Sequence, residues 1–309
     1  MFESNDMSRC AELIAMIGDL ERCQLMTDLA YERMERKQVE LLDILNRTNN
    51  DWNQTMFVML LRYMGGQHNK AASEVLAHRV GYNTVVRESG SLANIEALLF
   101  GASGLLELLN EDSYTAHLSE EFRHLAAKYS IEPMDAAMWR LKGMYANSHP
   151  ILRLAQLAAC FHRHSITMNS LLECRKRRDI SKLFNATISD YWVDTLHRFT
   201  SGSFISNRIG SFTSDILGIN FVVQMIFAYG HYTHSELLTQ RALELLENIP
   251  SENNRYTTIW NYHAQISKSA LESQAIIQLS RQYCECSRCD ECPLAKILSY
   301  RSKVRQTQE

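Results

Sequence analysis

The sequence contains few residues that stop a helix. Only 4 prolines and 12 glycines occur among its 309 residues, and helix-forming residues dominate between them. Apolar side chains recur at the spacing of amphipathic helices, first at Leu13, Ile14, Ile17 and Leu20, then at Leu41, Leu42 and Leu45. The sequence shows no alternating pattern typical of a strand. It therefore predicts an all-α fold of about a dozen helices in one irregular, bundle-like domain over residues 1–309.

Local signals place several helix ends. Ser91 is a good N-cap residue for the helical segment that follows it, and Pro150 suits the first turn of the next apolar helix. The Gly65–Gly66 pair predicts the end of a helix. Thr233–Glu236 has the form of a capping box. A last long helix is expected over Lys268–Tyr283.

Composition excludes several classes of protein. With 46% hydrophobic and 22% charged residues, the chain is typical of a globular fold. A net charge of -3 argues against a protein that coats nucleic acid, although a local basic patch is compatible with it. The N-terminus lacks the regions of a signal peptide, and apolar stretches such as Phe221–Gly230 are about half as long as a membrane span. We expect a cytoplasmic protein with no membrane segment.

The strongest chemical signal is a cysteine cluster near the C-terminus. The stretch YCECSRCDECP, residues 283–293, holds Cys284, Cys286, Cys289 and Cys292, half of the 8 cysteines in the chain. Cytoplasmic thiols stay reduced, so such a cluster favours metal or redox chemistry over structural disulfides. Two cysteines separated by two residues can reach one metal centre because the chain turns between them.

The spacing leaves the metal and its fourth ligand open. Cys286-x2-Cys289-x2-Cys292 followed by proline has the core of a bacterial-type iron–sulfur run, whereas Cys284-x4-Cys289-x2-Cys292 has the plant-type spacing. For the first pattern the local fourth candidate is Cys284. The remote candidates are Cys10, Cys23, Cys160 and Cys174. Zinc is the rival metal because it needs only four tetrahedral thiolates, and a reduced cysteine-rich turn without metal is the third alternative.

A second candidate site is basic. Arg175, Lys176, Arg177 and Arg178 form a short run that can contact phosphate; as a solvated helix end, the same charges suit a C-terminal turn. Arg208 lies in a Ser- and Gly-rich stretch, Thr200–Ser214, that is expected to be irregular and can form an anion-binding nest. These five cations are the candidate phosphate-binding residues.

The sequence offers no catalytic motif. It contains neither HExxH nor GxSxG, and no convincing pair of catalytic carboxylates. Glu96 is an acid on an apolar helix, so it needs a partner if it is buried, and we expect a structural ion pair there rather than catalysis. Trp139, Trp192 and Trp260 are expected in the core. We assign no catalytic residue and favour a chain that is not an enzyme by itself.

Several stretches, spread over most of the chain, match one family as an ordered set. They are ERMERK (Glu32–Lys37), NNDW (Asn49–Trp52), IEALLFGASGLL (Ile95–Leu106), PMDAAMW (Pro133–Trp139), LRLAQLA (Leu152–Ala158), YW (Tyr191–Trp192), FAYG (Phe227–Gly230), ALELLENIPSENN (Ala242–Asn254) and SQAIIQLSRQYC…CDEC (Ser273–Cys292). With these stretches the chain resembles uncharacterised bacterial proteins, frequent in the Bacteroidetes, that are catalogued as domain of unknown function 2851.

The resemblance implies that this chain corresponds to only part of its longer relatives. Relatives usually carry an additional β-rich N-terminal portion, faintly similar to restriction-endonuclease-like nucleases, which implies that this chain is the helical half. A separate protein partner would then supply the missing N-terminal domain. The chain departs from the family at Asn147–Ile151, which reads NSHPI where relatives tend to have an Arg-Pro…Phe-Pro-Thr stretch.

The resemblance also implies a ligand set. Cys284, Cys289 and Cys292 would form the usual three-cysteine core, with Cys286 as an extra cysteine. Cys10 would be the remote fourth ligand, so that the metal joins the two ends of the chain.

Three hypotheses follow for function. The first is a non-catalytic helical module whose cysteine cluster holds an iron–sulfur cluster or zinc in a structural role, and which acts through a protein partner. The second is a nucleic-acid-processing, nuclease-associated subunit. The third is an iron–sulfur redox protein.

Overall fold

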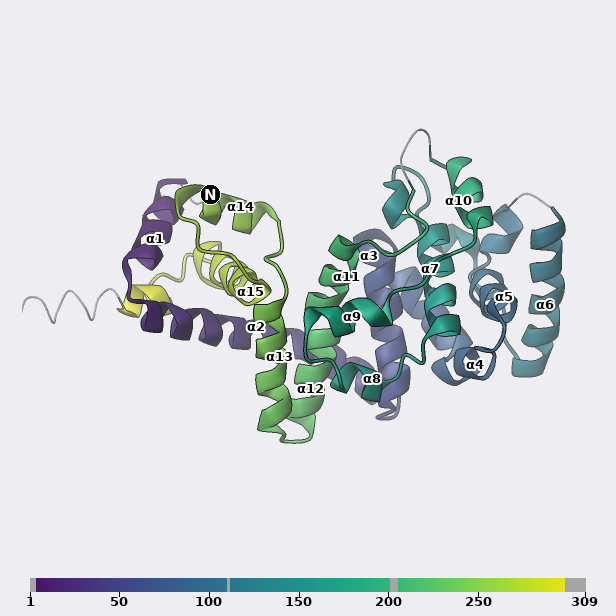
Figure 1. The fold of residues 1–309 in the computed structure, drawn as a ribbon, viewed down its shortest axis with the longest axis horizontal. Coiled ribbons are helices and arrows are strands. Elements are labelled where there is room, and N and C mark those ends of the chain that lie inside the picture. Colours follow the sequence, from purple (N-terminus) through teal and green to yellow (C-terminus); the bar gives the residue numbers. More distant parts are fainter. Residues whose placement is uncertain (1–3, 110–111, 201–204, 298–309) are drawn as a thin grey trace, which may run out of the picture. The chain divides into compact units, whose positions relative to one another are not determined.

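The computed structural model describes residues 4–109, 112–200 and 205–297. Over these ranges the chain forms fifteen α-helices, linked by short 3₁₀ and π segments, and no strand. The all-α prediction is therefore confirmed (Figure 1).

The described chain divides into two compact units. Unit 1 draws on residues up to Val39, on Arg175–Arg177 and on residues from Ile226 onward, whereas unit 2 comprises Glu40–Cys174 and Arg178–Met225. The division falls within helices α2, α9 and α12, which therefore each contribute to both units. The expectation of a single domain over residues 1–309 stays a prediction, and each unit is described by itself.

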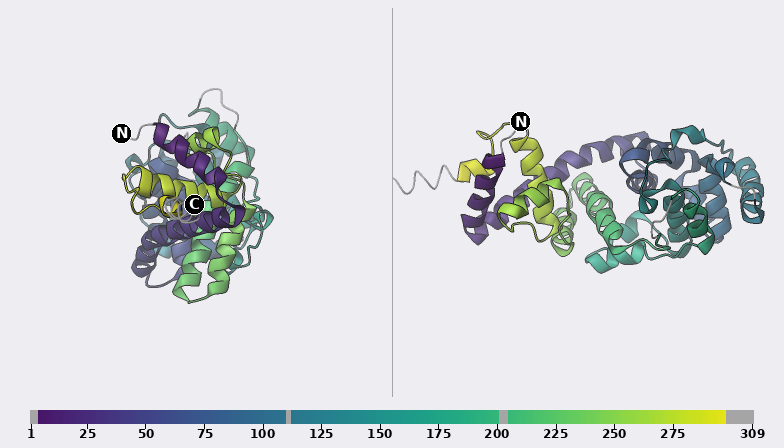
Figure 2. Two further views of the ribbon diagram at one scale, coloured as in Figure 1. Left: turned by 90° about the vertical axis from the view of Figure 1, so that its left-hand side faces the viewer. Right: turned by 90° about the horizontal axis from the view of Figure 1, so that it is seen from above.

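Unit 1 is built around one buried helix. Its elements are α1 (Ser4–Met16), most of α2 (Asp19–Arg47), most of α12 (Val223–Tyr232), α13 (Glu236–Asn248), α14 (Arg255–His263), α15 (Ala270–Leu279) and the π segment η5 (Ser280–Cys284). Nearly every residue of α15 is buried. Helices α13 and α14 pack against α15, and α1 packs against α14 (Figures 1 and 2).

Side chains from α2 satisfy the polar groups that α15 buries. Arg33 Nε donates to Gln274 Oε1 at 2.6 Å, and Arg36 Nε donates to Gln278 Oε1 at 3.4 Å. Buried amide side chains without partners are costly. These bonds therefore fix how α2 lies along α15 within unit 1.

Unit 2 has α5 and α7 at its centre. Its elements are the end of α2, α3 (Trp52–Val80), α4 (Tyr82–Arg87), α5 (Leu92–Ala102), η1 (Leu105–Leu108), α6 (Ser113–Tyr129), η2 (Ala136–Met138), η3 (Ala146–Ser148), α7 (Pro150–Arg163), α8 (Met168–Leu172), α9 (Arg177–Leu183), α10 (Asp190–His197), α11 (Ser211–Leu217), η4 (Gly218–Val222) and the start of α12. Helix α5 packs against α3, α6 and α7, and α7 also packs against α10. A Cβ atom on Gly101 would lie 2.1 Å from the Phe122 ring, so this glycine lets α6 approach α5 closely.

The predicted helix ends have mixed outcomes. Ser91 caps α5 through a 3.3 Å bond to its Oγ, Pro150 begins α7, and α15 with η5 spans nearly all of the expected last helix, as predicted. Gly66 has a non-helical φ of 62°, but the chain resumes its helical path and α3 continues to Val80. The capping box is wrong, because Ser235 precedes α13 without a side-chain cap bond.

One apolar segment reaches the length of a membrane span. Among the described residues, Ser211–Tyr232 forms a 22-residue helical run that is long and apolar enough to cross a bilayer. Of its apolar window, 67% is buried inside the protein, as in the core helix of a folded domain.

Candidate metal centre

The cysteine-rich turn follows directly from η5, and local hydrogen bonds reverse the chain there. Ser287 N donates to Cys284 O at 3.1 Å, and Arg288 N donates to Tyr283 O at 2.9 Å. Ser287 has a φ of 54°, in the left-handed region that commonly ends a helix. This reversal folds residues 289–292 back toward the end of η5.

Cys292 stands at the start of a further helical segment, residues 293–297. Lys296 N donates to Cys292 O at 3.1 Å. Burial raises the pKa of the Cys292 thiol, while hydrogen bonds from the backbone amides of Ala295 and Leu294 act in the opposite direction. Amides that point at a sulfur favour its thiolate form, which is the form that binds metals.

Cys284 lies close to other thiols of unit 1. Burial raises the pKa of Cys284 to about 12, and negative charge on Cys10, Cys292 and Cys289 raises it in turn. Charges act in this way only over short distances, so Cys10, Cys289 and Cys292 each lie in the vicinity of Cys284. Cys10 comes from α1, whereas the others come from η5 and the turn after it. The structure thus brings Cys10 to the cluster from the opposite end of the sequence.

Cys286 differs from these four thiols. It is exposed, as Cys289 also is, but its Sγ donates to Arg281 O at 3.3 Å. It is not among the charged groups that raise the pKa of Cys284. Cys10, Cys289 and Cys292 are thus the thiols whose charges act on Cys284, and the role of Cys286 as a ligand stays a prediction.

The other remote cysteines lie elsewhere. Cys160 and Cys174 are buried in unit 2, and burial raises the pKa of each thiol to about 12. Cys174 Sγ also donates to Ser170 O at 3.5 Å. Cys23 is exposed on α2. Cys10 is thus the one remote candidate whose charge acts on Cys284.

Neighbouring helices hold the turn in place. Tyr283 Oη donates to both carboxylate oxygens of Glu32 on α2, at 2.9 and 3.1 Å. Glu285 Oε1 accepts from Arg255 Nη2 at 2.7 Å and from Tyr256 Oη at 2.9 Å, both on α14. Sequence reasoning missed these anchors, although Glu32 opens the ERMERK stretch and Tyr283 opens the cysteine cluster.

The donor chemistry of the four thiols fits zinc or an iron–sulfur cluster, but the sulfurs are not in a finished coordination geometry. Among the described residues, no group of three or more His, Cys, Asp or Glu side chains is arranged to hold a metal ion. Zinc needs thiolate sulfurs at about 2.3 Å, so binding requires these side chains to converge and to release their protons. The assignment of these cysteines as ligands stays a prediction.

The basic residues are placed differently from the expectation. The run Arg175–Arg178 follows the end of α8 and enters the first turn of α9, instead of closing a helix at its C-terminus. Arg178 Nε lies 3.8 Å from Asp179 Oδ1. Arg208 is exposed, and its Nε donates to Thr187 Oγ1 at 2.9 Å. Arg175, Lys176 and Arg177 belong to unit 1 and the other two to unit 2, and phosphate binding by this set stays a prediction.

Glu96 is buried, but its partners are neutral. Trp192 Nε1 donates to Glu96 Oε1 at 2.8 Å, and Tyr114 Oη donates to Glu96 Oε2. The expected ion pair is therefore replaced by two hydrogen bonds from α6 and α10. Trp192 and Trp260 are fully buried and Trp139 is 6% exposed, so all three lie in the core as predicted.

The all-α fold and the cysteine turn define a helical protein with a candidate thiolate centre. Residues 1–255 match the family model described as protein of unknown function (DUF2851), so the chain belongs to this family. The cysteine-rich turn follows the matched range. Searches of curated proteins and of solved structures gave no match.

Proposed function

We propose that this chain is a non-catalytic helical module whose cysteine set binds a metal that fixes the shape of unit 1. The cysteine-rich turn carries the proposal, because it holds Cys284, Cys289 and Cys292 within one local chain reversal, and the charge of Cys10 acts on Cys284 from α1. A metal held there would tie α1 to the turn after η5. Closing so long a loop removes conformational freedom from the unfolded chain, which stabilises the fold.

The anchors of the turn support a structural role over a mobile redox site. Glu32 and Glu285 hold the turn to α2 and α14 through hydrogen bonds that involve no cysteine. Ligands positioned by hydrogen bonds from neighbouring elements bind metals more tightly. Zinc or an iron–sulfur cluster would supply the cross-link through thiolate bonds alone, and this proposal requires no redox chemistry.

A protein partner is the second part of the proposal. Met16 and Leu20, on either side of the connection between α1 and α2, have 76% and 84% of their surfaces exposed. Val39 is 66% exposed further along α2. Leu20 belongs to the apolar stripe that the sequence suggests for a core face, so its exposure supports a surface that a partner covers.

The test is the metal content of the whole chain. Protein purified anaerobically is analysed for iron and zinc, and its absorbance is recorded where thiolate-to-iron charge transfer occurs. We expect one metal centre per chain, lost in Cys289→Ser and in Cys10→Ser. A visible band accompanied by iron would identify an iron–sulfur cluster, and zinc without a band would identify a zinc site.

Two matched variants serve as controls. Cys23→Ser removes an exposed thiol on α2, and Cys286→Ser removes the cysteine whose sulfur bonds to Arg281. Both are expected to keep the metal. Protein that takes up neither metal, even after anaerobic reconstitution with iron and sulfide or with zinc, contradicts the proposal. Retention of the metal by Cys10→Ser rejects the link between the ends of the chain.

The alternatives have weaker support. For the nuclease-associated subunit, the Arg208 and Arg178 guanidinium groups already have protein partners in Thr187 and Asp179. Salt-dependent binding of DNA, weakened by Arg208→Ala, would favour that function. An iron–sulfur redox protein requires a reversible potential from the same cysteine set, which voltammetry of the iron-loaded chain would reveal.

A further inference from the structure

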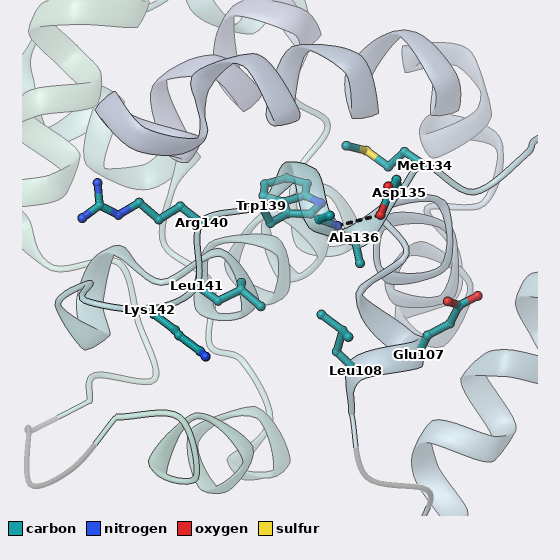
Figure 3. A pocket seen from close by; sticks show the side chains of 10 residues that line it. Glu107, Leu108, Met134, Asp135, Ala136, Trp139, Arg140, Leu141 and Lys142 are labelled. Atoms are coloured by element: carbon teal, nitrogen blue, oxygen red, sulfur yellow. Dashed lines mark hydrogen bonds between the residues drawn. The ribbon is translucent and has the colours of Figure 1, made fainter.

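A cavity of about 810 Å³ lies in unit 2, beside the irregular segment that follows α6 (Figure 3). Its lining comes from η1, at Glu107 and Leu108, and from the segment Met134–Lys142. The hollow is open on one side, and Glu107, Asp135 and Lys142 are exposed, so a ligand in it would stay partly solvated. Most of the PMDAAMW stretch lines this cavity.

The loop around the cavity is fixed to the core of unit 2. Met134 N donates to Ala102 O at 2.9 Å, and Trp139 Nε1 donates to Ser103 O at 3.0 Å. Gly104 has a φ of 72°, and a Cβ atom there would lie 2.4 Å from Met134 O, so only glycine permits this approach. These contacts join the loop to the turn between α5 and η1.

A buried asparagine holds the far end of the same loop. Asn69 is 1% exposed, and it pairs with both backbone groups of Arg140: Arg140 N donates to its Oδ1 at 2.8 Å, and its Nδ2 donates to Arg140 O at 3.0 Å. Asn69 reaches the loop from the non-helical part of α3. The cavity is thus bounded by a loop that is hydrogen-bonded at both ends, which reduces the ordering cost of binding a ligand.

Charges of opposite sign flank an apolar middle. In Figure 3 the Lys142 ammonium lies on one side, the carboxylates of Glu107 and Asp135 lie on the other, and Leu108 and Leu141 lie between them. Asp135 Oδ1 also caps η2 by accepting from Ala137 N at 2.8 Å.

Two further lining residues shape this arrangement. Arg140 Nη1 is 3.2 Å from His68 Nδ1, and its side chain points away from the acidic side. Leu108 is 47% exposed, so a ligand in the cavity would cover an apolar side chain that now faces water.

We propose that this cavity binds a short peptide as a zwitterion, with its ammonium end toward Glu107 and Asp135 and its carboxylate toward Lys142. The separation of the charges across an apolar middle matches a molecule that carries its two charges at opposite ends. The proposal is independent of the cysteine set, so its failure leaves the metal-binding proposal untouched.

The test uses trileucine as the probe and the full-length chain as the protein, with binding measured by isothermal titration calorimetry. We expect saturable binding at one site. Lys142→Ala and Glu107→Gln should each weaken the affinity about 3- to 10-fold, because each removes one charge contact at a partly solvated site. N-acetyl-trileucine and trileucine amide should each lose a similar factor with the unchanged protein.

Charge-matched controls separate this site from general electrostatics. Glu132→Gln removes an exposed carboxylate just before the loop that does not line the cavity, and it should leave the affinity unchanged. Glu107→Gln should reduce the discrimination against the N-acetylated peptide, with Asp135 keeping part of it, and Lys142→Ala should abolish the discrimination against the amide. The absence of heat at millimolar trileucine overturns the proposal, and so does equal binding of the free and blocked peptides.

Discussion

Glu96 is a carboxyl group enclosed in the core of unit 2, with 0% of its surface exposed. Burial raises its pKa, and the hydrogen bonds from Tyr114 and Trp192 act in the opposite direction. The Trp192 ring also stacks on Phe100, with centroids 3.9 Å apart and planes within 5°. The carboxyl group therefore connects α5 to α6 and α10 while the rings fill the space around it. Its role is structural in this arrangement, because both of its oxygens are engaged by neutral donors.

Replacement of Glu96 tests this role. Glu96→Ala leaves the indole N–H of Trp192 buried without an acceptor, so we expect a loss of about 2–4 kcal/mol in the free energy of unfolding. Glu96→Gln should cost about 1 kcal/mol or less, because an amide can still accept from Trp192 and donate to the Tyr114 hydroxyl. Urea denaturation measures both variants, with Glu120→Ala on the exposed face of α6 as the control. Equal losses in Ala and Gln would mean that the carboxylate charge itself is needed.

The hydrogen bonds to the Glu88 carboxylate predict that the stability of the protein depends on pH. Lys128 Nζ, Tyr129 Oη and Asn94 Nδ2 all donate to its carboxylate, and the first two contribute most to lowering its pKa from 4.5 to about 2. A pKa lowered by folding gives stability that is present above about pH 4.5 and is lost as pH falls toward 2. Lys128 is more than half exposed, so solvent screening limits the contribution to about 1–2 kcal/mol.

The variant Glu88→Gln should therefore be less stable than the unchanged chain by that amount at pH 7. The difference should shrink steadily between pH 4.5 and pH 2, as the carboxyl group of the unchanged chain takes up its proton. Urea unfolding across this pH range measures it, and Glu120→Gln should show no such pH-dependent difference. If the difference in unfolding free energy stayed constant across this pH range, Glu88 would act through packing and not through its charge.

At the scale of the element, the sequence predicts those helix ends that depend only on residues within the same turn. Ser91 and Pro150 act within one turn of the helices they begin, so their signals are readable without the fold. The Thr233–Glu236 stretch has the residue types of a capping box. However, His234 takes a left-handed φ of 56°, and no side-chain cap bond forms at Ser235. At Gly66 the sequence correctly predicts an interruption of the helix. It does not predict that α3 resumes after the interruption, because that depends on packing within unit 2.

Ser287 and Ser130 offer a matched pair for testing the helix ends. Both are serines in the left-handed region, with φ of 54° at Ser287, three residues after η5, and 55° at Ser130, directly after α6. This conformation costs an L-residue about 1 kcal/mol, which glycine avoids. We expect Ser287→Gly and Ser130→Gly each to raise the free energy of unfolding by about 0.5–1 kcal/mol. Chemical denaturation measures the change, and loss of stability in both variants would contradict the role assigned to the backbone.

At the scale of the whole molecule, contacts between residues that are far apart in sequence could not be predicted from the sequence. Arg33 bonds to Gln274, which lies 241 residues further along, and no local pattern pairs them. Spacing alone likewise leaves Cys10, Cys23, Cys160 and Cys174 as equal candidates for a remote ligand. Only the folded chain separates them, because it places Cys10 in the neighbourhood of Cys284 and buries Cys160 and Cys174 in unit 2. The Met134–Lys142 cavity is of the same kind, since Asn69 and Ala102 hold its loop from other helices.

The proposed metal should act on one unit and not on the other. A ligand that binds only the folded state stabilises it by about 2.7 kcal/mol at a hundred times its dissociation constant, and here all four thiols belong to unit 1. Removing the metal with a chelator should therefore speed amide exchange in α1, α14 and α15, whereas α5 and α7 of unit 2 exchange as before. Hydrogen–deuterium exchange with mass spectrometry of the full chain resolves the two units, and Cys10→Ser should reproduce the effect without chelator. Cys23→Ser should leave the exchange of both units unchanged. If amide exchange became faster to the same degree in both units, the metal would stabilise the chain as one cooperative body. If exchange in unit 1 did not become faster, the cysteine set would have no structural role.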